Sequence, residues 1–265
     1  SMMTAFNALR IYMKIHTISG YIQHIYLAEH DHGLLLLDGC SRADVETVSR
    51  FITDTLHRPL SDLKLIVVTH MHPDHAGGAV RLKALTGAPI AAHPKAKSWY
   101  AGLMGRAAHA IDLGLTWWVA NRIGKQRESI WYNPVLCADI LLEDNQNLPL
   151  FNEWKVLYSP GHTDHDISIM HEPTRQAYVA DLLVKVKGEL VPPYPLCHPN
   201  QYRKSLQRIA QSSIETIFCA HVAPVQLVDI PFDHVIENAP TLPKNHWHSA
   251  KNRINRKLFG KTAQH

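Results

Sequence analysis

Several side chains that can bind a metal lie within one short stretch, residues 69–78. This stretch, Thr-His-Met-His-Pro-Asp-His-Ala-Gly-Gly, holds three imidazoles (His70, His72 and His75) and one carboxylate (Asp74). His70 and His72 are two positions apart, so in an extended or turn conformation their side chains point the same way. A proline then bends the path before the second pair. Such a loop can direct two pairs of ligands at two neighbouring points, which favours two metal ions over one.

Strands must position these side chains, and the sequence predicts a strand directly before the loop. Residues 65–68 form a continuous apolar run that is typical of a buried strand. The sequence also predicts strands at 154–158, 176–180 and 214–219. Because functional residues commonly lie in loops at strand ends, the segments that follow these strands are expected along the same edge of the fold as the loop at 69–78.

The four motifs together resemble those of the metallo-β-lactamase-fold hydrolase superfamily. His-x-His-x-Asp-His after an apolar strand resembles the signature of that family. Tyr-Ser-Pro-Gly-His-Thr at 158–163 resembles its Gly-His-Thr element, Ala-Tyr-Val-Ala-Asp at 177–181 the strand that delivers a bridging aspartate, and Phe-Cys-Ala-His at 218–221 the last ligand-bearing element. The resemblance covers about residues 11–225, and the motifs come in the family's order.

The fold that this resemblance implies is a mixed α/β (α+β) architecture, a four-layer αββα sandwich with a helical insertion. The order of predicted elements supports it independently, since strands cluster in two stretches with helices between and after them. We expect one metallo-β-lactamase-fold domain over residues 1–243, with the insertion at about 95–135. Residues 244–265 are predicted to be a basic C-terminal helix or tail.

The resemblance also implies how the ligands are shared between two divalent metal ions. The ligands expected for the first ion are His70, His72 and His162. Those expected for the second are Asp74, His75 and His221. Asp181 would bridge the two ions. Imidazole and carboxylate ligands without a cysteine suit Zn²⁺, which is our first expectation, and also Fe or Mn.

Two such ions can hold a water between them and lower its pKa from 15.7 toward roughly 7, which gives a strong nucleophile at neutral pH. The sequence therefore predicts a dinuclear metallohydrolase that uses a bridging hydroxide, with Asp74 and Asp181 as catalytic residues. The substrate class that we expect is an ester, thioester or lactone, as in glyoxalase II-like enzymes, lactonases and acyl-thioesterases. The insertion is rich in large apolar residues, which favours an apolar acyl group.

Some related branches fit the motifs less well. A class B1 β-lactamase would carry cysteine where Asp181 stands, and flavodiiron relatives would carry glutamate in place of His72. β-Lactam or phosphodiester hydrolysis on the same site, a mono-iron persulfide dioxygenase and a non-catalytic signalling or binding module of this fold remain as alternatives.

Residues next to the ligands are candidates for orienting the imidazoles. The resemblance implies such a role for Asp38, which precedes Gly39 at the end of a predicted strand. Asp164, His165 and Asp166 follow His162 directly and are candidates for the same role. The resemblance favours Asp166, which lies where many relatives carry His or Asp, whereas His165 is expected to be only a neighbour.

Composition limits the partners and the compartment. The 265 residues are 46% hydrophobic and carry a net charge of only +4, so we expect a small-molecule substrate and no nucleic acid. We expect a monomer or homodimer. No apolar run reaches the roughly 18 residues that a membrane span needs. The four widely spaced cysteines and the absence of a signal-peptide pattern favour the cytoplasm.

Overall fold

The computed structural model describes residues 12–244, and they form two mixed β-sheets that lie face to face. The first sheet has six strands in sequence order. They are β1 (Met13–Ser19), β2 (His24–His30), β3 (Gly33–Leu36), β4 (Leu63–Val68), β5 (Ile90–Ala92) and β6 (Ile140–Leu141). Strands β1 to β3 form an antiparallel meander, and β3 to β6 run parallel.

The second sheet also has six strands, in the order β14-β13-β10-β9-β8-β7. They are β7 (Asn147–Leu148), β8 (Phe151–Tyr158), β9 (Ile167–His171), β10 (Gln176–Tyr178), β13 (Thr216–Phe218) and β14 (Val225–Gln226). Its one parallel pair is β10 with β13. A separate hairpin joins β11 (Val184–Val186) to β12 (Glu189–Val191).

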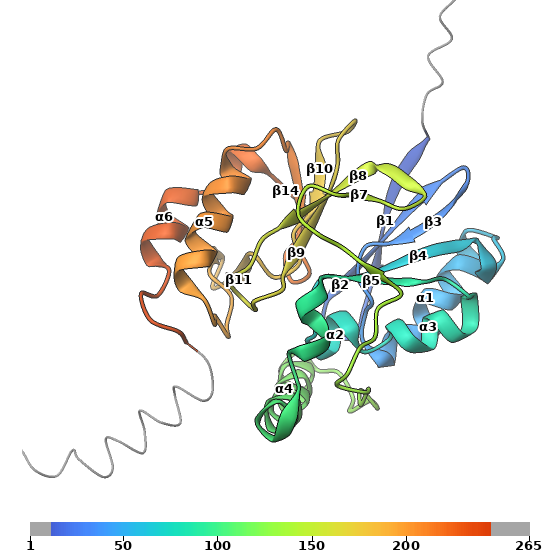
Figure 1. Ribbon diagram of the computed structural model, residues 1–265, viewed down its shortest axis with the longest axis horizontal. Coiled ribbons are helices and arrows are strands. Elements are labelled where there is room, and N and C mark those ends of the chain that lie inside the picture. Colours follow the sequence, from blue (N-terminus) through green and yellow to red (C-terminus); the bar gives the residue numbers. More distant parts are fainter. Residues whose placement is uncertain (1–11, 245–265) are drawn as a thin grey trace, which may run out of the picture.

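Helices cover the outer face of each sheet, which gives four layers (Figure 1). On the first sheet lie α1 (Val45–Arg50), continued by a π-helical turn at Phe51–Thr55, and α3 (Ala79–Thr86). On the second lie α5 (Pro199–Ala210) and α6 (Phe232–Asn238). The loop at residues 69–78, called the metal loop below, includes the short α2 (Pro73–Ala76). The long α4 (Gly102–Arg122) lies at one end of the sandwich. The predicted αββα architecture is confirmed.

Alternation along the strands explains the layers. On β4, Leu65 and Val67 face the interior between the sheets, whereas Ile66 and Val68 face the helices, because successive strand residues point to opposite faces. Three apolar cores result: one under α1 and α3, one between the sheets around Trp154, and one under α5.

One predicted strand is a hairpin instead. The sequence over 184–191 predicts a continuous strand, but Lys187 and Gly188 have φ angles of 51° and 92°. Two consecutive positive φ values form a turn that reverses the chain, so this segment folds back on itself. The predicted C-terminal helix at 244–265 lies outside the described residues except for Lys244, which pairs with Leu196. Within residues 12–244, no helix is both long and apolar enough to span a bilayer.

His30 gives the sandwich a pH-dependent contribution to stability. Trp154 Nε1 donates to His30 Nε2 at 3.0 Å inside the core. Burial lowers the pKa of His30 to about 4, and His32 and His171 add to that effect. Because the folded state binds this proton less readily than the unfolded chain does, stability is fully present above about pH 6.5 and falls as the pH drops toward 4.

We predict that His30→Gln, which keeps an acceptor for Trp154 but does not titrate, makes this decline shallower. Urea unfolding of the wild type and the variant at several values between pH 7.5 and 4.5 measures it, with the exposed His234→Gln as control. Equal slopes for the wild type and His30→Gln would contradict the assignment.

Candidate metal centre

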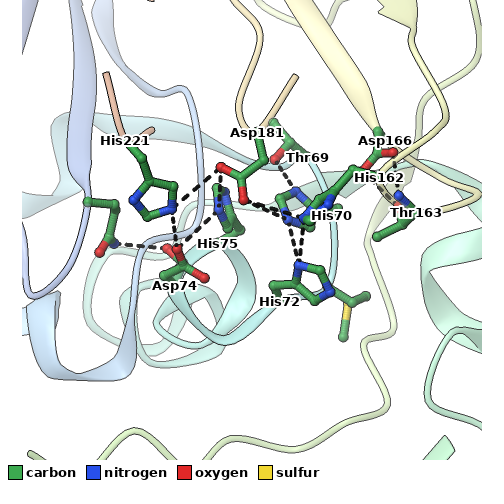
Figure 2. A network of polar contacts seen from close by, with 12 residues as sticks. Thr69, His70, His72, Asp74, His75, His162, Thr163, Asp166, Asp181 and His221 are labelled. Atoms are coloured by element: carbon green, nitrogen blue, oxygen red, sulfur yellow. Dashed lines mark hydrogen bonds and ion pairs between the residues drawn. The ribbon is translucent and has the colours of Figure 1, made fainter. Parts of the chain in front are cut away.

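The fold brings all seven predicted ligands together in two groups that share Asp181 (Figure 2). Within each group, one ligand atom per residue lies within 4.8 Å of the others. The first group is His70, His72, His162 and Asp181. The second group is Asp74, His75, Asp181 and His221. The grouping is the one that the family resemblance implies.

The carboxyl ends of four strands from both sheets bring the ligands together. β4 ends at Val68, two residues before His70, and Pro73 at the first turn of α2 starts the helix that carries Asp74 and His75. In the second sheet, β8, β10 and β13 end a few residues before His162, Asp181 and His221 respectively. Gly161 is required beside His162, because a Cβ there would lie 2.5 Å from Tyr202 Cα.

In the first group, the far nitrogen of two rings is hydrogen-bonded away from the centre. His162 Nδ1 donates to Pro195 O at 2.5 Å. His70 Nδ1 donates to Thr69 Oγ1 at 3.2 Å, since the Thr69 hydroxyl itself donates to Asp38. Both bonds leave the Nε2 lone pair facing inward. His72 is reversed: its Nδ1 lies 3.1 Å from His70 Nε2 and 2.9 Å from His162 Nε2.

The second group follows the same rule. His75 Nδ1 donates to Asp38 Oδ2 at 2.6 Å, and His221 Nδ1 donates to Ile22 O at 3.2 Å. Their Nε2 atoms therefore point lone pairs at carboxylates. His75 Nε2 lies 3.3 Å from both Asp74 Oδ2 and Asp181 Oδ1, and His221 Nε2 lies 3.0 Å from Asp74 Oδ2.

Lone pairs facing carboxylate oxygens repel unless a cation lies between them. His75 Nε2 and Asp181 Oδ1 are both buried and have no hydrogen-bond partner. A buried polar atom without a partner costs about 1–3 kcal/mol, and a charged one costs more. Nitrogen and oxygen donors that converge in this way fit divalent metal ions, because a metal would satisfy each inward lone pair.

The protonation states of two histidines and of the shared carboxylate agree with this interpretation. Burial lowers the pKa values of His70 and His72, and neighbouring imidazoles lower them further, so both rings are neutral at pH 7. Burial acts to raise the pKa of Asp181, but His75 and His221 outweigh it and hold that pKa well below the usual range. Neutral imidazole and ionised carboxylate are the forms that bind metals. Burial acts to lower the pKa values of His75, His162 and His221, but the facing carboxylates outweigh it and raise them, so a metal ion would displace a proton from each of these three rings.

Asp38 connects the ligand shell to both sheets. Its Oδ2 accepts hydrogen bonds from His75 Nδ1, from Thr69 Oγ1 at 2.7 Å and from Tyr178 OH at 2.8 Å. Its Oδ1 accepts from the backbone N–H groups of Thr69 and Gly39, each at 3.1 Å. The structure therefore gives Asp38 the orienting position that the sequence suggested. The hydrogen bonds from Thr69 and Tyr178 to Asp38 were not predicted from the sequence.

Asp164, His165 and Asp166 form no hydrogen bond or ion pair with the ring of a ligand histidine, so the structure shows no direct orienting role for them. Asp166 instead accepts from the backbone N–H groups of Gly161 and Thr163 and so shapes the loop. His165 donates from Nδ1 to Asp164, and its Nε2 accepts from Met71 N at 3.0 Å. His165 therefore holds the backbone between the first two ligands.

The insertion contributes residues that the sequence did not single out. Asp112, on α4, places Oδ2 3.8 Å from His72 Nε2 and accepts from Tyr100 OH at 2.6 Å. Tyr132 OH donates to Met71 O in the metal loop. No local signal marks these side chains, because their approach to the loop depends on how the insertion packs.

A cavity of about 560 Å³ opens onto both ligand groups. We call it the metal lobe, and its lining includes His72, Asp74, His162, Asp181 and His221. A second cavity of about 430 Å³, the apolar lobe, shares His72, Asp112 and Pro195 with the first. The rest of the apolar lobe is lined by Trp99, Met104, Gly105, Ala107, Ala108, Ile111 and Cys197.

This site and fold agree with the comparison to known proteins. The sequence model of the metallo-beta-lactamase superfamily matches residues 18–221, and the chain belongs to that superfamily. No curated protein gives a significant sequence match.

Solved structures share the fold at low sequence identity. A metallo-beta-lactamase family protein, TTHA1429 from Thermus thermophilus, is 20% identical with a TM-score of 0.61, over 94% of this chain and 82% of that one. The archaeal superfamily protein ST1585 from Sulfolobus tokodaii is 19% identical with a TM-score of 0.62, over 85% and 86%. TTHA1623, solved in a di-iron-bound form, is 21% identical with a TM-score of 0.57, over 83% and 99%.

We predict that Asp38→Asn weakens metal binding about tenfold to a hundredfold, because the amide cannot accept all of the hydrogen bonds that fix His75 and Thr69. A titration against a chromogenic chelator measures the affinity. The exposed Asp54→Asn is the matched control, and its affinity should equal that of the wild type. Unchanged affinity in a folded Asp38→Asn protein would contradict the role of Asp38.

Proposed function

We propose that the protein is a dinuclear metallohydrolase that cleaves an ester, thioester or lactone with an apolar acyl group. The observation that carries this proposal is the continuity between the two lobes. The seven-residue ligand set opens into the metal lobe, and the apolar lobe begins at the same residues, His72, Asp112 and Pro195. A carbonyl at the ligand set could therefore extend its acyl group into the apolar lobe.

In this proposal His70, His72, His162 and Asp181 hold one ion, and Asp74, His75, His221 and Asp181 hold the other. The donor set suits Zn²⁺ first and Fe or Mn as well. When bound, the two ions supply Lewis acidity and make water a competent nucleophile at neutral pH.

The chain's own residues orient and move protons. Asp74 lines the metal lobe, and its backbone carbonyl accepts from Gln23 Nε2 at 2.9 Å, which fixes the start of α2. We assign Asp74 to orienting the attacking water and to passing its proton on to the leaving group. Asp181 links the two ligand groups, because its two oxygens face different groups. Its Oδ2 lies 3.4 Å from His162 Nε2, and its Oδ1 lies 3.3 Å from His75 Nε2.

The apolar lobe would set the acyl preference. Trp99, Met104 and Ile111 give it apolar walls, and Gly105 and Ala107 leave it room. Burying one methylene contributes about 0.8 kcal/mol, so a few carbons would change the rate measurably.

The test compares acetyl and octanoyl thioesters of one thiol, matching lactones and a bis-aryl phosphodiester with the metal-loaded protein. We expect the octanoyl thioester or a long-chain lactone to be cleaved best. Ala107→Trp should fill the apolar lobe and lower kcat/KM for the octanoyl substrate by about tenfold or more, with a smaller effect on the acetyl substrate.

Ala110→Trp is the matched control, because Ala110 is exposed on the same helix and lines neither lobe. Its chain-length preference should equal that of the wild type. Cleavage of the phosphodiester alone, or a preference that Ala107→Trp leaves unchanged, would overturn the proposal.

A further inference from the structure

The metal lobe contains two cationic side chains that the proposed chemistry does not use. Arg122 is the last residue of α4, and Lys185 lies in β11 of the separate hairpin. They are the only arginine and lysine among the described residues that line this lobe. They come from different elements, since Arg122 belongs to the insertion and Lys185 to the hairpin after Asp181.

Neither cation is paired with an acidic side chain in the part of the chain that the structure describes. No carboxylate among residues 12–244 forms an ion pair with Arg122 or Lys185. The acidic residues of the lobe have other contacts: Asp74 and Asp181 face the ligand imidazoles, and Asp112 accepts from Tyr100. The positive charge at this end of the lobe is therefore available to a ligand.

An aromatic contact limits where the guanidinium lies. Arg122 lies over the ring of Trp118, one turn back on α4, with 4.9 Å between its Cζ and the ring centroid. Stacking on an aromatic ring leaves the edge of the guanidinium free for a planar or tetrahedral anion. A lone surface arginine would sample many positions, whereas this one is held against a wall of the lobe.

The position of Arg122 on α4 sets its distance from the ligand set. Asp112 lies at the junction of the two lobes, 3.8 Å from His72. Arg122 lies ten residues further along the same helix, which corresponds to a rise of about 15 Å. An anion bound at Arg122 would therefore lie toward the end of α4 that is away from the apolar lobe, and a spacer in the substrate would separate it from a carbonyl at the ligand set.

We propose that Arg122 and Lys185 form a binding site for a carboxylate or phosphate on the leaving group of the substrate. The substrate is then amphiphilic, with its acyl chain in the apolar lobe, its scissile carbonyl at the ligand set and an anion at the far end of the metal lobe. This inference rests on the proposed function for the direction in which the substrate lies. The anion site itself rests only on the two cations and the lobe that they line.

The test measures binding and needs no turnover. The probes are three thioethers that cannot be hydrolysed: 6-(butylthio)hexanoate, 6-(butylthio)hexyl phosphate and the neutral 6-(butylthio)hexanamide. Isothermal titration calorimetry with the metal-loaded protein gives Kd for each. We expect the wild type to bind the better anionic probe about tenfold more tightly than the amide, and the carboxylate and phosphate arms show which anion fits.

Arg122→Gln and Lys185→Gln should each lower this ratio at least about threefold, and the double variant should bring it close to one. Lys187→Gln is the matched control: it removes the same charge from the same hairpin, but Lys187 does not line the lobe. Its ratio should equal that of the wild type.

A ratio near one in the wild type would overturn the anion site. A ratio that the double variant retains would overturn it too, because the charge preference would then come from the metal ions. The matching hydrolysable thioester is assayed separately. If it is not cleaved while the binding ratio and its dependence on both cations hold, the proposed hydrolysis fails and the anion site stands.

Discussion

The convergence of imidazole lone pairs on two points is the constraint on which the rest of this structure depends. Four of the five rings have a hydrogen bond on the far nitrogen, to Thr69, Asp38, Pro195 O or Ile22 O, and those bonds leave the near nitrogen facing inward. Without a cation, such an arrangement would place lone pairs and carboxylates against one another in a buried space. The orientation of the ligand rings therefore depends on these hydrogen bonds, and such bonds are typical of a metal centre rather than of a packed core.

The sandwich makes this arrangement possible because it brings strand ends from both sheets to one edge. β4 supplies the loop with four of the ligands, and β8, β10 and β13 supply one ligand each from the opposite sheet. Asp38 joins the two halves, since it contacts Thr69 after β4 and Tyr178 at the end of β10. The insertion then forms walls around this edge: α4 lines both lobes and carries Asp112 at their junction. The candidate ligands follow strands of the superfamily fold, whereas the walls of the lobes come from the insertion and, in the metal lobe, also from the hairpin.

Much of this could be predicted from the sequence. The seven candidate ligands lie in short local motifs after apolar strands, and such motifs can be recognised without knowing how distant parts of the chain pack. The four layers followed mostly from the family resemblance, and the order of strands and helices supported them. Asp112, Arg122 and Lys185 could not be placed, because their roles depend on how α4 and the hairpin pack, and no spacing encodes that contact. The turn between β11 and β12 was not predicted, because Lys187 adopts a positive φ angle that a lysine in the sequence does not indicate. Asp166 lies at the position favoured for a group that orients a ligand ring, but its carboxylate instead accepts hydrogen bonds from the backbone N–H groups of Gly161 and Thr163.

The most direct test of the central claim is the metal content of protein purified without chelator, measured by elemental mass spectrometry for the wild type and for Asp181→Ala. A site with two ion positions that share one carboxylate predicts about two equivalents of Zn, Fe or Mn in the wild type and one or fewer in the variant. A single equivalent of iron that Asp181→Ala leaves unchanged would contradict the bridged site, and a mono-iron oxygenase chemistry would then replace hydrolysis as the function to test.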